Sequence, residues 1–211
     1  MCEEIIKEVQ TFAEPKFAEW TKPFLSIGKS SKEIVLGVRV PILRKLAKKY
    51  KDIENEKLKN LLRSNTHEIR ALAVFIMILK SKKEPEKMCD LYLKNLKFIN
   101  NWDLVDYSAP HIVAPNVSDQ VLIELADSNY LWANRVAMVS TIYFIKQGDF
   151  KLALNFAKKF MKHEHHLMHK AAGWMLREVG KKNVKVLKQF LKKYSEEMSS
   201  IMRIYAREKL R

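Results

Sequence analysis

A tryptophan and an aspartate, Trp102 and Asp106, lie four residues apart in the segment Asn101-Trp-Asp-Leu-Val-Asp-Tyr-Ser-Ala-Pro110. On a helix this spacing places the indole and the carboxylate side by side on one face. Because the rest of the chain is strongly basic, a carboxylate that faced a polyanion would only repel it. We therefore predict that the pair takes part in chemistry. The alternative is that Asp106 caps or salt-bridges a neighbouring helix.

Basic residues outnumber acidic ones, with 39 Lys and Arg against 24 Asp and Glu, a formal charge of +15 and a sequence pI near 9.7. This excess favours a polyanionic partner, most often nucleic acid, although a lysine-rich solvated surface would look the same. Two distant cysteines, Cys2 and Cys89, indicate neither a disulfide framework nor a zinc knuckle. No secretory signal is visible and the longest apolar run, residues 71–79, is too short to cross a bilayer, so we expect a cytoplasmic protein that binds no membrane.

The elements that must position the pair are helices. Apolar residues recur at spacings of three and four, and 5 Gly and 6 Pro in 211 residues leave few turn signals. We predict an all-α fold of about a dozen helices, with a helix stop at Ala109-Pro110. Trp20 and Trp132 are expected in the core or between helices. The clearest apolar stripes lie in residues 38–47, 58–62, 72–79, 136–143 and 187–191.

The helices also look repetitive. Arg70, Arg135, Lys170 and Arg203 each precede small or apolar residues, at separations of 65, 35 and 33 residues, and a missing member would fall near position 103. A period in the thirties predicts an α-solenoid, which we take as a single domain over residues 1–211, with a compact irregular bundle as the alternative. In a solenoid these cations would form a track for a phosphate backbone. Each one alone could instead cap carbonyls or pair with nearby glutamates.

Three motifs in order carry a resemblance to a known family. Asn101-Trp-Asp-Leu-Val-Asp106 followed by Ala-Pro, then Leu131-Trp-Ala-Asn-Arg135, then His169-Lys-Ala-Ala-Gly-Trp-Met-Leu-Arg-Glu178 together resemble the AlkD family of DNA alkylation-repair glycosylases. Gly37-Val-Arg-Val-Pro-Ile-Leu-Arg-Lys-Leu-Ala47 resembles the amino-terminal region of that family. The similarity therefore covers most of the chain, and residues 198–211 match less well.

The resemblance implies HEAT-like helical repeats that bind a DNA duplex against a concave surface, with no metal and no cofactor. It also implies hydrolysis of the N-glycosidic bond of cationic N3- and N7-alkylated purines, with the lesion still stacked in the duplex. The family's active-site positions match Trp102, Asp106, Arg135 and Trp174. Our candidate DNA contacts are Arg70, Arg135, Lys170, Arg177 and Arg203. The expected partner is double-stranded DNA that contains alkylated purines, bound by a monomer.

The chemistry of these residue types fits the assignment. An alkylated purine already carries positive charge, so it needs little general-acid help to leave, and the deoxyribose becomes oxocarbenium-like as the bond breaks. A carboxylate such as Asp106 stabilises that charge and orients water. Two indoles offer cation–π attraction of about 0.5 to 2 kcal/mol each. Arg135 would clamp a phosphate, because its planar fork pairs bidentately with phosphate oxygens.

Two other functions are weighed against the enzyme. A HEAT-repeat protein that binds DNA without turnover predicts salt-sensitive duplex binding and no base release. A protein-interaction solenoid predicts indifference to DNA and an acidic protein partner. A histidine cluster invites a zinc interpretation, but its spacing lacks the His-Glu-x-x-His arrangement, so we predict no metal site. The cluster is formed by His163, His165, His166 and His169.

Overall fold

The computed structural model describes residues 2–28 and 31–210, and no strand occurs among them. The first helices are α1 (Cys2–Gln10), α2 (Pro15–Thr21), η1 (Lys22–Phe24), α3 (Val40–Lys49), α4 (Asn55–Leu62), α5 (His67–Lys80), α6 (Pro85–Lys94) and η2 (Leu96–Phe98), where η marks a 3₁₀ turn. The next are α7 (Trp102–Ile112), η3 (Ala114–Asn116), α8 (Asp119–Asp127), α9 (Leu131–Lys146), α10 (Lys151–Lys159), η4 (Phe160–Lys162), α11 (His166–Lys182), α12 (Val184–Tyr194) and α13 (Ser200–Arg207). The chain divides into two compact units after Ser108, inside α7. The single domain over residues 1–211 stays a prediction.

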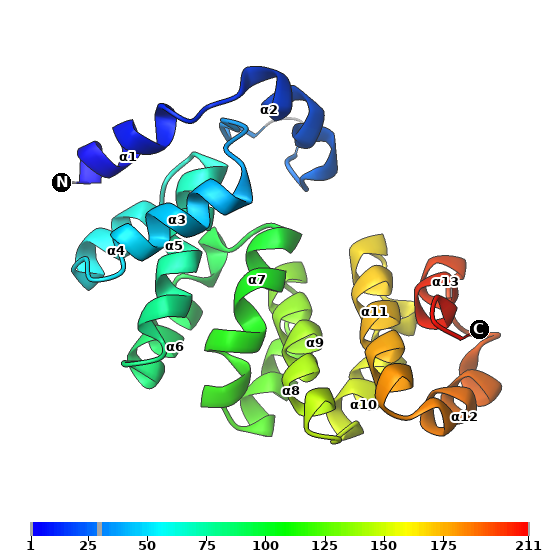
Figure 1. Ribbon diagram of the computed structural model, residues 1–211. Coiled ribbons are helices and arrows are strands. Elements are labelled where there is room, and N and C mark those ends of the chain that lie inside the picture. Colours follow the sequence, from blue (N-terminus) through cyan, green and yellow to red (C-terminus); the bar gives the residue numbers. More distant parts are fainter. Residues whose placement is uncertain (1, 29–30, 211) are drawn as a thin grey trace. The chain divides into compact units, whose positions relative to one another are not determined.

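The central helix of the first unit is α5, against which α3, α4 and α6 pack (Figure 1). Its sequence is apolar on nearly all sides, and every residue from His67 to Met77 is buried. A helix of this kind needs cover all round, which the amphipathic helices beside it supply. The side chains they turn inward include Leu43, Leu46 and Ala47 of α3 and Leu58, Leu61 and Leu62 of α4.

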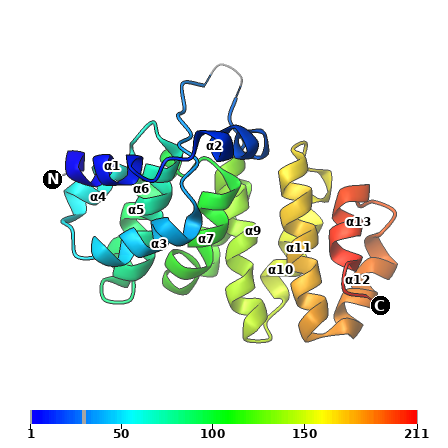
Figure 2. The ribbon, with the colours of Figure 1, turned by 45° about the horizontal axis from the view of Figure 1, so that its top comes forward.

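The second unit is built around α11, which contacts α9, α10, α12 and α13. Figure 2 shows α13 lying along α11, and a glycine allows this approach. A Cβ at Gly173 would lie 2.6 Å from the carbonyl oxygen of Met202, so any larger residue would push α13 away. Asn183 and Ser199 cap α12 and α13 with side-chain oxygens that accept from backbone N–H groups. This packing fixes the helix that carries Trp174.

The repeat predicted from the basic residues corresponds to a common register in alternate helices. Arg135 and Lys170 are the fifth residues of α9 and α11, while Arg70 and Arg203 are the fourth residues of α5 and α13. Asp106 is the fifth residue of α7, so it occupies the repeat position that the sequence placed near 103. The predicted fold class, an all-helical repeat architecture, is confirmed.

Four of the five predicted apolar stripes fall within helices, and the stripe over residues 38–47 begins two residues before α3, which starts at Val40. The predicted helix stop at Ala109-Pro110 is wrong, because α7 continues to Ile112 with Pro110 inside it. Pro110 has no N–H to donate to the carbonyl of Asp106 four residues earlier, so α7 continues past the proline without that one backbone hydrogen bond. Among the described helices, none combines the length and the apolar character that a bilayer crossing needs.

Candidate functional site

The first turn of α7 holds the predicted tryptophan against the segment that follows α2. The Trp102 indole is half-buried, and its Nε1–H donates to the backbone carbonyl of Phe24 at 2.8 Å. The side chain of the fully buried Asn101 starts the helix, since its Oδ1 accepts from the backbone N–H of Trp102 at 2.9 Å and of Ser26 at 3.2 Å. These contacts hold the indole at one place in the first unit.

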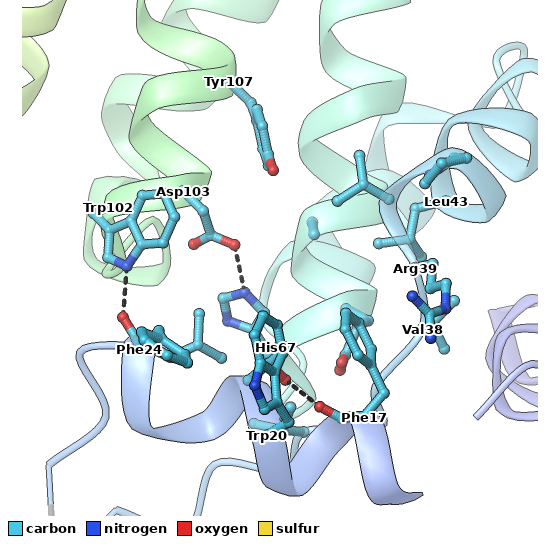
Figure 3. Close-up of a pocket in the computed structure, with 17 residues that line it drawn as sticks. Phe17, Trp20, Phe24, Val38, Arg39, Leu43, His67, Trp102, Asp103 and Tyr107 are labelled. Atoms are coloured by element: carbon cyan, nitrogen blue, oxygen red, sulfur yellow. Dashed lines mark hydrogen bonds and ion pairs between the residues drawn. The ribbon is translucent and has the colours of Figure 1, made fainter. Parts of the chain in front are cut away.

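A cavity of about 720 Å³ lies beside Trp102, within the first unit (Figure 3). Residues of α2, η1, α3, α5 and α7 line it, and most of the side chains that face it are apolar. Such a volume is typical of a small-molecule site. Its aromatic lining consists of Phe17, Trp20, Phe24, Trp102 and Tyr107.

A cluster of charged side chains lies buried beside the cavity. The Nδ1 atom of His67 is 3.0 Å from Oε1 of Glu33, and its Nε2 atom is 2.8 Å from Oδ2 of Asp103. Nη2 of Arg70 lies 2.5 Å from the same Glu33 oxygen, and its Nη1 donates to the carbonyl of Ser64 at 3.1 Å. The cluster ties the loop before α3 to α5 and to the first turn of α7.

The histidine of this cluster is charged at neutral pH. Burial disfavours the imidazolium, but hydrogen bonds to Asp103 and Glu33 outweigh it and raise the pKa of His67 to about 9. Burial likewise opposes ionisation of Glu33, yet His67 and Arg70 lower the pKa of its carboxyl. His67 and Glu33 therefore both stay charged over the physiological range.

The two carboxylates of α7 have different surroundings. Asp103 lines the cavity and binds His67, so its charge is committed to the fold. Asp106 is half-buried and does not belong to the cavity lining. Trp102 and Asp106 do lie four residues apart on one helix, as the sequence predicts.

In the second unit, a carboxylate one turn further along α11 holds the second predicted tryptophan. The Trp174 indole is half-buried, and its Nε1–H donates to Oε1 of Glu178 at 3.1 Å. Glu178 also accepts from Nε of Arg177 at 3.3 Å and from Nζ of Lys181 at 2.8 Å. The indole is thus fixed beside two cations.

The predicted DNA contacts differ in how far they reach solvent. Arg70 is only 4% exposed and binds Glu33 and a carbonyl, which argues against the expected phosphate contact. Arg135 is also 4% exposed, and its Nη1 donates to the carbonyl of Leu167 at 2.8 Å. Burial of these two guanidiniums could not be read from a basic repeat.

The remaining three cations are half-buried in the second unit. Lys170 lies on α11, and Arg177 pairs with Glu178 and Glu208. Arg203 donates to the carbonyl of Ser195 at 2.9 Å. Capping of carbonyls and pairing with glutamates, the alternative weighed for these residues, therefore describes part of what they do.

The histidine cluster shapes the turn before α11. The side chain of His165 caps that helix by accepting from the backbone N–H of Leu167 at 3.2 Å, and His163 accepts from the N–H of His165 at 3.0 Å. Burial and neighbouring histidines lower the pKa of both imidazoles. Within residues 2–28 and 31–210, no group of three or more His, Cys, Asp or Glu side chains is arranged to hold a metal ion.

Comparison with known proteins decides the family. The family model described as DNA alkylation repair enzyme matches residues 5–210, which is nearly the whole chain. The chain belongs to the DNA alkylation repair enzyme family. A solved structure described as a predicted DNA alkylation repair enzyme from Enterococcus faecalis shares the fold, with a TM-score of 0.70, 16% identity, and coverage of 94% of this chain and 96% of that one. No curated protein matches. Family membership makes repair of alkylation damage the activity class and DNA the partner.

The exposed aromatic surface around Trp20 was not predicted from the sequence. Trp132 is buried as predicted, but the prediction for Trp20 is wrong, because its side chain is 64% exposed. Trp20 stacks on Phe17 and lies tilted against Phe24 on its own segment. The spacing of these three aromatics, at positions 17, 20 and 24, was the signal that could have revealed them.

Proposed function

We propose that this protein is a monofunctional DNA glycosylase that hydrolyses the N-glycosidic bond of N3- or N7-alkylated purines in duplex DNA. The observation that supports this most is the family match over residues 5–210, which includes the Trp102 and Asp106 pair on α7. The proposed reaction leaves an abasic site and uses water as the nucleophile, with no metal and without rotating the base into a deep pocket.

Asp106 is the proposed catalytic carboxylate. Alkylation makes the purine a cationic leaving group, so the positive charge that needs stabilisation develops on the sugar. Asp103, the neighbouring carboxylate on the same helix, is engaged by His67 and is not assigned this role. Asp106 would stabilise the oxocarbenium-like sugar and orient the attacking water.

The two half-buried tryptophans are assigned to the cationic base. Trp102 and Trp174 each have their indole N–H bound to a protein acceptor, which holds the ring plane in one orientation. A fixed ring attracts a purine cation through its π face and loses that attraction once the neutral base is released. This difference favours binding of the damaged base over binding of the product.

Arg135 is assigned to a phosphate near the lesion, with Lys170, Arg177 and Arg203 as further backbone contacts. Arg135 is as deeply buried as Arg70, at 4% exposure, so this role requires its guanidinium to become accessible when DNA binds. Arg135→Ala is expected to weaken both excision and DNA affinity, since the guanidinium would contact the backbone in both complexes. Loss of excision with unchanged affinity would remove Arg135 from the phosphate role.

The direct test is release of free base. Purified protein in excess is incubated with duplex DNA that carries N7-methylguanine, and released base is quantified by chromatography against spontaneous depurination. The proposal predicts release well above that background. Duplex binding without release would favour a DNA-binding repeat protein, and indifference to DNA would favour a protein-interaction scaffold.

A further inference from the structure

Two exposed aromatic side chains stand out on the first unit, with Trp20 64% and Phe24 62% exposed. The rings of Phe17 and Trp20 are stacked with centroids 5.7 Å apart, and those of Trp20 and Phe24 are 5.3 Å apart. We call Phe17, Trp20 and Phe24 the aromatic row. The guanidinium carbon of Arg39 lies 4.2 Å from the Phe17 ring centroid and ends the row with a cation. Phe17 is half-buried, so Trp20 and Phe24 form the exposed part of the row, and neighbouring exposed aromatics are typical of a binding surface.

The aromatic row forms one wall of the cavity of about 720 Å³. Figure 3 shows the row on α2 and η1, with Trp102 and Tyr107 of α7 facing it across the cavity. Ring faces on both sides suit a flat, aromatic occupant, because stacked rings gain from close parallel contact. The volume leaves room for such a ring together with the group that carries it.

The charged groups of the cavity already have protein partners. Asp103 is bound by His67, Arg39 is bound by Glu14, and Glu68 accepts from two backbone N–H groups. Among the described residues, none of the buried polar atoms that lack a partner belongs to the cavity lining. The charged groups of the lining are therefore engaged within the protein, and the cavity offers its occupant mainly ring faces.

Two lysines show what that ring is attached to. Lys16 on α2 directly precedes Phe17, Lys22 on η1 lies between Trp20 and Phe24, and both lysines are exposed. A flat aromatic ring joined to a negatively charged backbone is a nucleotide in a strand. We propose that the aromatic row and its cavity form a stacking site for an unpaired nucleobase of DNA, with adjacent phosphates near Lys16 and Lys22. This site requires no base release, so it goes beyond the proposed function.

The test compares two undamaged fluorescent duplexes that differ in one base. One carries a single extra adenine in its centre, and the other carries an abasic residue at that position, so their backbones match. Fluorescence anisotropy of the full chain is expected to show about tenfold tighter binding to the adenine bulge. Trp20→Ala and Phe24→Ala should lose this preference. Trp20→Phe should keep it, and so should Phe12→Ala, a matched control at an exposed aromatic outside the cavity.

A second readout uses the indole itself. Stacking of the adenine in the cavity is expected to quench the fluorescence of Trp20 and Trp102, and Trp20→Phe should reduce that quenching while Trp132→Phe keeps it in full. Equal binding of the two duplexes by the wild-type protein, or an unchanged preference in Trp20→Ala, would overturn the proposal. So would an apolar dye, such as anilinonaphthalene sulfonate, that binds the cavity and is not displaced by the adenine bulge. Base release from N7-methylguanine is measured separately, so failure of either proposal is visible without the other.

Discussion

Trp102 in the first unit and Trp174 in the second are held by different kinds of partner. The indole of Trp102 donates to a backbone carbonyl at the edge of an aromatic cavity. The indole of Trp174 donates to Glu178, a carboxylate that also gathers two cations. The first indole is placed among ring faces and the second among charges. The cations beside Trp174 add an attraction for the phosphates that surround the base assigned to it.

The charges of the two units follow the same division. Residues 1–108 carry 21 basic and 15 acidic side chains, whereas residues 109–211 carry 18 basic and 9 acidic ones. In the first unit, the charged side chains of one buried cluster form ion pairs with one another: Glu33, His67, Arg70 and Asp103. The twofold excess of cations in the second unit is the stronger electrostatic attraction for DNA.

Removing one charge from the buried cluster should have the largest effect on the stability of the first unit. Glu33→Gln removes the anion that Arg70 and His67 share and leaves two cations under-compensated in the interior. We expect a loss of about 3 kcal/mol in the free energy of unfolding, measured by urea denaturation. Glu84→Gln, which breaks an exposed pair with Lys87, is the control and should change nothing measurable. Equal stability of the two variants would show that the cluster is not structural.

Stability of the first unit should also fall at alkaline pH. The pKa of His67 is about 9 when folded and 6.5 in a free side chain, so the folded protein binds the proton more tightly. Protonated His67 contributes about 3 kcal/mol to the free energy of unfolding below pH 6.5, and this contribution is lost as pH rises towards 9. Urea denaturation at a series of pH values should show this slope in the wild-type protein and not in His67→Gln. The same dependence of stability on pH in both proteins would contradict the raised pKa of His67.

Local features were predictable from the sequence, and long-range ones were not. The spacing of Leu58, Leu61 and Leu62 predicted the buried face of α4, because a helix repeats over neighbouring residues. The buried cluster joins residues 33, 67 and 103, whose contact depends on how separate elements pack. Trp20 was misplaced for the same reason, since a helical spacing does not reveal whether another element covers that face.

The predicted positions of three site residues have different outcomes. Trp102 and Asp106 lie on one helix as predicted. Arg70 lies in the predicted register, but its guanidinium is buried against Glu33. A register fixes which residues are equivalent, whereas exposure depends on the partners each side chain meets. The roles of Asp106, Arg135 and Trp174 in catalysis stay predictions.

The cations of the second unit should make the smallest individual contributions. If Lys170 contacts one phosphate, Lys170→Gln lowers the slope of log affinity against log salt by about 0.9. Fluorescence anisotropy at several salt concentrations measures this slope on an undamaged duplex. Lys94→Gln in the first unit, where the lysine pairs with Asp90, should leave the slope unchanged. An equal drop in both variants would erase the distinction between the units.

The catalytic role of Asp106 is tested most directly by comparing Asp106→Asn with Asp103→Asn. Single-turnover release of N7-methylguanine and duplex affinity are measured for both variants and for the wild-type protein, with folding checked by circular dichroism. We predict that Asp106→Asn slows release about a hundredfold or more while most of the DNA affinity is retained. Asp103→Asn should chiefly lower stability, because it breaks the contact with His67. Release by Asp106→Asn at the wild-type rate would contradict the account.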